Sequence, residues 1–175
     1  MRIDLVPFSP CLAVQALRYT LISESSSELR LTVQLKGSIA SELEDVDQVG
    51  QREFGLWQYH CFELFLGEAG STAYWELNLA PNGNWNCFGF SDYRQDQKES
   101  DRCALTQISA TGRGPTYQLE ARILTNPSFQ TTDAVLSLGA AATIKTATDL
   151  HYFSIRHGVT PDFHHRDHHI PWKLQ

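Results

Sequence analysis

The sequence predicts an all-β fold, an antiparallel β-sandwich of the jelly-roll type with little helix. Short apolar segments recur along the chain, many of them alternate apolar and polar residues with period two, and turn-forming stretches such as GEAGST, TGRGP and HGVTP separate them. A helical pattern is scarce. With almost no helix to cover a sheet, the strands must bury their apolar faces against each other, in a sandwich or a barrel.

The alternation is clearest at residues 29–35 and 117–123, where every second residue is apolar, as in a half-buried strand. The one helical candidate is SIASELEDVDQ at 38–48, which is too short and polar to organise a core. The remaining expected strands are residues 2–7, 13–23, 52–57, 60–66, 73–80, 84–90, 104–110, 134–144, 151–156 and 169–174.

Length and composition favour a single domain over residues 1–175, because 42% hydrophobic residues with 11% aromatics suffice for one substantial core. The formal net charge is −6, with no cluster of Lys or Arg, so nucleic acid and anionic membranes are not expected partners. The N-terminal segment MRIDLVPFSPCLAVQ lacks the long apolar stretch of a secretion signal, so we expect a cytoplasmic protein.

The dipeptide Asn82-Gly83 predicts a hairpin over residues 73–90, because it favours a two-residue turn with positive φ at both positions. Counting outward from that turn places Leu77 opposite Phe88 and Trp75 opposite Phe90 on one face. The other face then carries Glu76, Asn78, Trp85, Cys87 and Gly89.

The preceding strand extends this pattern. If 60–66 pairs antiparallel with the first strand of the hairpin, Leu64 meets Trp75 on the apolar face. Glu63 then lies directly opposite Glu76, with their Cβ atoms ~5 Å apart. Like charges across a ladder repel, so either the two side chains splay into open water or a proton, an arginine, a cation or a hydroxylated ligand compensates them.

The four cysteines are widely spaced and form no CxxC pair, which predicts free, mostly buried thiols and no zinc cage. In the expected pairing Cys61 and Cys87 lie two strands and about 10 Å apart, too far for a disulfide. The cysteines are Cys11, Cys61, Cys87 and Cys103.

Two segments resemble a known family. The run GLWQYHCFELFLGEAGSTAYWELNLAPNGNWNCFGFSDYR, with HGVTPDFHHRD near the C-terminus, is similar to the bacterial DOMON-like proteins, which are related to family 9 carbohydrate-binding modules. The resemblance spans 55–94 and 156–167 and implies a β-sandwich whose concave sheet holds a ligand, a sugar or, in some relatives, haem. The residues that it carries over are Trp57, Glu63, Glu76, Asn78, Trp85 and Arg94.

The chain also departs from the wider superfamily. His60 stands near a position where many relatives have Asp, which puts a calcium or sugar contact there in doubt. Met1 is the only methionine, so a methionine-ligated haem is implausible, whereas a bis-histidine haem stays open.

The tail segment HHRDHH, residues 164–169, is a weak metal motif, because at most two imidazoles converge from each side of an extended chain. A turn whose histidines contact backbone groups or solvent is the alternative. We expect Asp162, His164 and Arg156 at the edge of the site, and Arg94 and Arg156 to neutralise the two glutamates.

These observations predict a ligand-binding β-sandwich without a metal or a cofactor. Trp57 or Trp85 would stack on a sugar-like face, and Glu63, Glu76 and nearby polar groups would bind its hydroxyl or acidic groups. A glycoside hydrolase that uses the two glutamates and a haem-binding module are the alternatives, although no nucleophile elbow, Walker loop, dinucleotide fingerprint or HExxH motif occurs.

Overall fold

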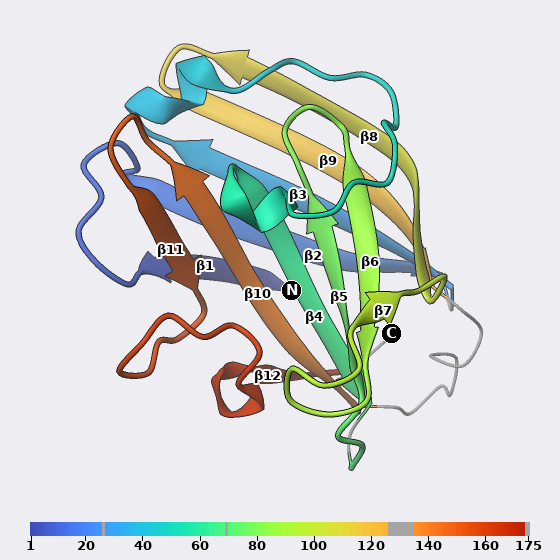
Figure 1. Cartoon of the computed structure of the whole chain (residues 1–175). Helices are drawn as coiled ribbons and strands as arrows, with labels where there is room; N and C mark the ends of the chain where they lie inside the picture. Colours follow the sequence, from blue (N-terminus) through green and yellow to red (C-terminus); the bar gives the residue numbers. More distant parts are fainter. Residues whose placement is uncertain (26, 69, 126–134, 174–175) are drawn as a thin grey trace.

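The computed structural model describes residues 1–25, 27–68, 70–125 and 135–173, and nearly all regular structure in them is β (Figure 1). Within these described residues, three short 3₁₀ turns interrupt the strands: η1 (Ser38–Glu42), η2 (Leu56–Gln58) and η4 (Arg166–His168). The strands are β1 (Arg2–Pro7), β2 (Ala16–Ser25), β3 (Glu28–Lys36), β4 (Cys61–Glu68), β5 (Tyr74–Leu79), β6 (Trp85–Phe90), β7 (Lys98–Glu99), β8 (Cys103–Arg113), β9 (Thr116–Thr125), β10 (Val135–Lys145), β11 (Leu150–Ser154) and β12 (Ile170–Lys173).

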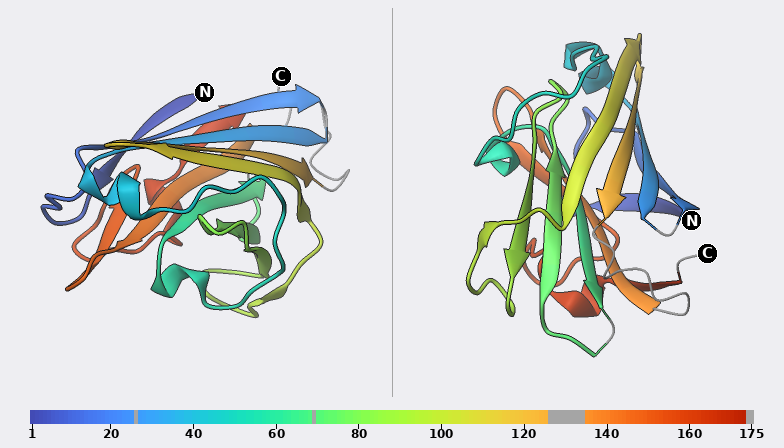
Figure 2. Two further views of the ribbon diagram at one scale, coloured as in Figure 1. Left: turned by 90° about the horizontal axis from the view of Figure 1, so that it is seen from above. Right: turned by 90° about the vertical axis from the view of Figure 1, so that its right-hand side faces the viewer.

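The strands form two layers that face each other (Figure 2). One layer has the order β1-β2-β3-β9-β8; the other has the order β7-β6-β5-β4-β10-β11, with β12 beside β10. Strand β1 belongs to both layers, because Arg2 to Leu5 pair with β2 while Val6 and Pro7 pair with β11. The predicted antiparallel sandwich is confirmed, as a single curled sheet.

The core lies between the two layers. Alternate residues of β3 and β9, such as Leu31, Val33 and Leu119, point inward and are completely buried, as the period-two pattern predicted. Leu64 and Leu77 meet them from the other layer. Strands β4, β5 and β6 differ from β3 and β9, because nearly every residue on both of their faces is buried. Other parts of the chain must therefore cover the outer face of β4–β6.

Two segments depart from the sequence prediction. The expected strand 52–57 is absent: Arg52 makes an isolated bridge to Trp85, and Gly55, with φ of 84°, then turns the chain into η2. The expected helix 38–48 is only the 3₁₀ turn η1, which has no side-chain cap hydrogen bond. The two-residue strand β7 was not predicted.

The turn between β5 and β6 has three residues, so the predicted two-residue turn was wrong. Ala80 N–H donates to Asn84 O at 2.8 Å, Gly83 N–H donates to Ala80 O at 3.0 Å, and Gly83 has a φ of 86°. Pro81 explains the three-residue turn, because its fixed φ suits the second position of a type I turn. In hairpins of this length the type I turn is followed by a residue in the left-handed conformation, which here is Gly83.

This change shifts β6 by one residue and exchanges its faces. Glu76 pairs with Phe88 and Leu79 pairs with Trp85, so the predicted pairs Leu77–Phe88 and Trp75–Phe90 were wrong. Trp85 and Cys87 therefore belong to the core between the layers.

The pairing of β4 with β5 differs from the prediction by two residues. Glu63 pairs with Asn78, and Leu64 pairs with Leu77, so Glu63 does not lie directly opposite Glu76. Because side chains alternate with period two, a two-residue shift leaves every side chain on its predicted face. Glu63 and Glu76 therefore remain on one surface, in a diagonal arrangement.

All four cysteines are buried and free, as predicted. Within the described residues, no helix is long and apolar enough to cross a membrane.

We predict that Gly83→Ala lowers the free energy of unfolding by about 2 kcal/mol, measured by urea denaturation. A Cβ atom there would lie 2.8 Å from Gln48 O, in addition to the strain of a positive φ. Gly114→Ala is the matched control, because Gly114 has a φ of 59° but no atom within 4 Å of its Cβ position. We expect it to lose only about 1 kcal/mol; equal losses in the two variants would contradict the close packing of the β5–β6 turn.

Candidate functional site

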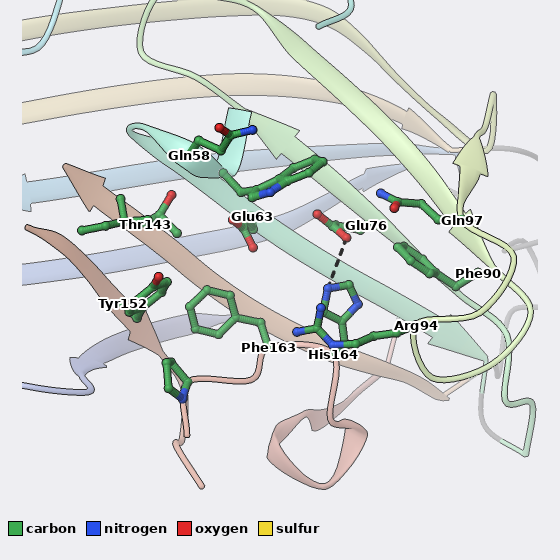
Figure 3. Close-up of a pocket in the computed structure, with 13 residues that line it drawn as sticks. Gln58, Glu63, Glu76, Phe90, Arg94, Gln97, Thr143, Tyr152, Phe163 and His164 are labelled. Atoms are coloured by element: carbon green, nitrogen blue, oxygen red, sulfur yellow. Dashed lines mark ion pairs between the residues drawn. The ribbon is translucent and has the colours of Figure 1, made fainter. Parts of the chain in front are cut away.

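A cavity of about 500 Å³ opens on the outer face of β4–β6, the face that the core does not use (Figure 3). Its floor comes from these strands and β10, and its walls come from η2, β11, the loop after β6 and the segment before η4. Aromatic and ionisable side chains share the lining: Trp57, Phe90, Tyr152, Phe163, Glu63, Glu76, Arg94 and His164.

Trp57 forms one wall. The left-handed Gly55 starts η2 and presents the indole over β6, where its ring lies 5.9 Å from Phe88 in an edge-to-face contact. Thr143 on β10 donates a hydrogen bond of 2.9 Å to Tyr59 O and so holds the end of this turn against the sheet. The tryptophan is half-buried, so part of its surface remains available to a ligand.

A stacked aromatic pair forms the opposite part of the floor. The rings of Tyr74 and Phe90 lie 4.7 Å apart and nearly parallel, and the edge of His164 packs against Phe90 and Phe65 at 5.1 and 5.2 Å. This packing fixes the imidazole from three sides. His164 is therefore a rigid part of the cavity.

Two carboxylates lie at the base of the cavity, and both are almost completely buried, Glu63 with 2% and Glu76 with 4% of their surface exposed. Glu76 Oε1 accepts a hydrogen bond of 2.7 Å from Asn78 Nδ2, and Glu76 Oε2 lies 3.7 Å from His164 Nε2. Glu63 Oε1 is buried without a hydrogen-bond partner. A buried carboxylate oxygen without a partner is rare in a structural role and marks a functional position.

The burial of the two carboxylates changes their acidity. Burial raises the pKa of Glu76 to about 7, against the opposing effects of the Asn78 hydrogen bond and the Arg94 charge. Burial, and then the neighbouring charge of Glu76, raises the pKa of Glu63 well above its usual range. Burial therefore favours the protonated forms of both carboxyl groups at pH values at which an exposed glutamate is ionised.

His164 is neutral at physiological pH, because burial and then the charge of Arg94 lower its pKa to about 4. Its tautomer follows from the hydrogen bonds. Tyr74 Oη accepts the Arg94 N–H at 3.2 Å, so its own proton is free to donate to His164 Nδ1 at 2.7 Å. The imidazole proton then resides on Nε2 and faces Glu76.

Asp162 joins two walls of the cavity. Its carboxylate accepts hydrogen bonds from Arg94 Nη2 at 3.1 Å, from the Tyr93 hydroxyl and from the backbone N–H of His164 at 3.1 Å. Arg94 itself has a φ of 53°, a left-handed conformation that this ion pair supports. Arg94, which was predicted to neutralise the two glutamates, thus binds mainly Asp162.

The HHRDHH segment fastens the wall to the sheet. Arg166 donates hydrogen bonds to Ser71 O and, at 3.0 Å, to Glu68 O. His169 Nε2 donates a hydrogen bond of 3.0 Å to Phe163 O, and its Nδ1 accepts one of 3.3 Å from Ser137 Oγ on β10. Gly139 leaves the space that the imidazole ring fills. No group of three or more potential metal ligands occurs in the part of the chain that the structure describes.

The structure brings most of the predicted site residues together. Five line the cavity, and two support it: Asn78 through Glu76, and Asp162 through Arg94. Trp85 does not line it, because the shifted register of β6 turns the indole into the core, where Arg52 lies 4.6 Å above the ring. Arg156 is exposed and does not line it either. The five lining residues are Trp57, Glu63, Glu76, Arg94 and His164.

Several lining residues were not predicted. Phe90 was assigned to the core by the wrong register, Tyr152 and Thr143 carry no motif in the sequence, and Phe163 lies in the quoted segment HGVTPDFHHRD but was not among the predicted site residues. Their common signal is tertiary: β10 pairs with β4, and β11 pairs with β10, which places Thr143 and Tyr152 beside the cavity.

Comparisons with known proteins place the fold. No protein-family model matches the chain, and no curated protein matches it in sequence. A protein of Bacteroides uniformis, described as a candidate carbohydrate-binding protein, has a similar structure, with a TM-score of 0.68 and 10% identity over 99% of this chain and 87% of that one.

A family 9 carbohydrate-binding module of Caldicellulosiruptor kristjanssonii is also similar in structure. Its glucose complex gives a TM-score of 0.60 at 10% identity, covering 99% of this chain and 82% of that one. Its cellotriose complex gives 0.54 at 11% identity, covering 87% and 71%. At such low identity these matches establish the β-sandwich fold.

We predict that Glu76→Gln stabilises the protein at pH 8 but not at pH 4. Folding raises the pKa of the Glu76 carboxyl group to about 7. The group therefore contributes its full stabilisation of the folded state at pH values below its unfolded pKa, and this contribution is lost as the pH rises through about 7. The neutral amide retains the acceptor for Asn78 without the buried charge. We expect a gain of about 2 kcal/mol at pH 8 in urea denaturation.

Glu44→Gln is the control for this prediction, because Glu44 is exposed and lies outside the cavity. Its effect on stability should be small at both pH values. A Glu76→Gln variant that is no more stable than wild type at pH 8 would show that the Glu76 carboxylate is better solvated than its burial indicates.

Proposed function

We propose that this protein binds a carbohydrate or a sugar-like metabolite in the cavity on the outer face of β4–β6. The observation that carries the proposal is the combination of aromatic walls with two buried carboxylates at the base. Sugar rings present apolar C–H faces that stack on aromatic rings, and hydroxyl groups that need paired donors and acceptors. A volume of about 500 Å³ suits a ligand of one or two sugar rings.

Each wall has a role in this proposal. Trp57 supplies the stacking surface, Tyr152 and Phe163 enclose the ligand, and Glu76 and Arg94 bind its polar groups. The aromatic packing around His164 and the Asp162–Arg94 ion pair hold these groups in place before the ligand arrives, which reduces the entropy lost on binding. The glucose and cellotriose complexes of a protein with the same fold support this class of ligand.

The motifs quoted above also support a finer assignment. We propose that the chain is a bacterial DOMON-like domain related to family 9 carbohydrate-binding modules, and that it acts in the cytoplasm, where four free thiols persist. Neither nucleic acid nor a membrane is proposed as its partner.

We predict that Trp57→Ala weakens saccharide binding at least tenfold, because the variant loses the stacking surface, and tenfold corresponds to about 1.4 kcal/mol. A glycan array followed by isothermal titration calorimetry is the measurement. Arg156→Ala is the matched control and should bind as wild type does, because Arg156 is exposed outside the cavity. The proposal fails if no saccharide binds the wild type, or if the two variants bind alike.

A glycoside hydrolase is the alternative function, and one observation favours it. Burial raises the pKa of Glu76 to about 7 and the pKa of Glu63 well above its usual range, and a glycosidase needs a carboxyl group with a raised pKa as its general acid. Against it, both side chains project in the same direction from neighbouring strands instead of flanking a bond. Hydrolysis of chromogenic glycosides that Glu63→Gln abolishes would establish the enzyme; no turnover over a broad panel would end it.

A haem-binding role fits the cavity poorly. Both nitrogens of His164, the one histidine among its described lining residues, already face partners, Tyr74 and Glu76. A Soret band on addition of haem to the protein would overturn this conclusion.

A further inference from the structure

Glu63 is the most unusual group in the cavity. It is 2% exposed, its Oε1 has no hydrogen-bond partner, and it lines the cavity from the middle of β4 (Figure 3). Leaving a buried carboxylate oxygen unpartnered costs on the order of 1–3 kcal/mol. The fold retains this cost although an apolar residue would avoid it.

The part of the chain that the structure describes supplies no close counter-ion for the two carboxylates. Among the described residues, the ion-pair contact that either of them makes is the 3.7 Å approach of His164 to Glu76, and His164 is neutral. Arg94 acts on both from a greater distance, while its guanidinium binds Asp162 at 3.1 Å.

The other groups that act on Glu63 are not cationic. They are Glu76, the Cys61 thiol on the same strand, and Tyr19, whose hydroxyl donates to Ala141 O at 2.6 Å. The base of the cavity is therefore a position for a cation, because the described residues place no positive group in direct contact with either carboxyl group.

The form of the cavity restricts that partner. Metal ions such as Ca²⁺ need six to eight oxygen ligands, whereas no cluster of three ligating side chains occurs in the described part of the chain. An ammonium group needs fewer partners, and it also interacts favourably with the faces of aromatic rings such as Trp57 and Phe163.

We propose that the ligand of this cavity is an amino sugar, whose protonated primary amine binds between Glu63 and Glu76. This inference rests on the proposed function and narrows its class of ligand. The sugar ring lies against Trp57, and the ammonium group donates hydrogen bonds to Glu63 Oε1 and to Glu76.

The proton balance of binding follows from the resting state. Burial raises the pKa of both carboxyl groups and so favours their protonated forms in the empty cavity, whereas a bound ammonium group favours their ionised forms. An amine that arrives protonated therefore displaces one proton from the pair to the buffer, and no bond to carbon forms or breaks. A hydroxyl group in the same position displaces none.

The experiment compares three ligands with the same ring: glucosamine, glucose and N-acetylglucosamine, and the corresponding galactose series. Calorimetry at pH 7 in two buffers of different ionisation enthalpy gives both affinity and proton release. We expect one of the amines to bind about tenfold more tightly than its hydroxyl analogue, equal to about 1.4 kcal/mol, and to release a proton. The N-acetyl compound, which keeps the nitrogen but not the charge, should lose this advantage.

Glu63→Gln is the decisive variant, because it keeps the shape of the side chain and removes the charge. The preference for the amine should disappear, whereas the neutral sugar should bind within about threefold of wild type. Arg156→Ala is the control and should retain the preference. Wild-type protein gives an independent check: the preference should shrink at pH 5, where Glu76, with a pKa of about 7, is protonated while His164, with a pKa of about 4, is still neutral.

The outcomes separate the two proposals. Neutral sugars that bind as well as amines, or a preference that survives in Glu63→Gln, would overturn this inference and leave the proposed function intact. If amines without a sugar ring, such as spermidine, bind and no sugar does, the anionic position stands and the carbohydrate proposal falls. Binding of none of these compounds would overturn both.

Discussion

The register between β5 and β6 is the constraint on which the site depends. Pro81 and Gly83 close a three-residue turn, and the resulting pairing of Glu76 with Phe88 decides which face of β6 meets the core. A strand displaced by one residue would exchange the two faces, moving Phe88 and Phe90 into the core and Trp85 into the cavity. The aromatic floor of the cavity and the position of His164 above it both follow from this turn.

A second constraint is that β4–β6 are covered on both faces. One face packs against the other layer, and the outer face is covered by η2 and by the segment that ends in η4. Arg166 attaches this segment to the backbone of the β4–β5 loop, and His169 fills the space beside Gly139. The histidine-rich tail thus acts as a structural support, and the cavity is the space that this cover leaves open.

The buried carboxylates give the cavity its chemical character. Desolvation raises the pKa of both carboxyl groups. The hydrogen bond from Asn78 to Glu76 and the more distant charge of Arg94 favour ionisation, but they only partly offset this effect. The protein therefore maintains an energetically unfavourable group at the centre of a rigid aromatic frame. Sites of binding and catalysis commonly retain such strain, because a ligand that relieves it gains affinity and selectivity.

The sequence by itself determined the sandwich and the faces of most strands. The period-two alternation at 29–35 and 117–123 determines which face of each strand is buried, because the apolar residues all lie on one face and the polar residues on the other. It also placed Glu63 and Glu76 on one surface, since an error of two residues in the register of β4 leaves the faces unchanged.

Tertiary structure decided the rest. Trp85 was assigned to the site because Asn82-Gly83 suggests a two-residue turn, whereas the conformation of Pro81 sets a longer one. Thr143 and Tyr152 reach the cavity through the pairing of β10 with β4 and β11, contacts between residues far apart in the chain that no local pattern encodes. Phe163 reaches it from the segment before η4. Local periodicity specifies which side of a strand is buried, but only the packing of distant segments specifies what covers it.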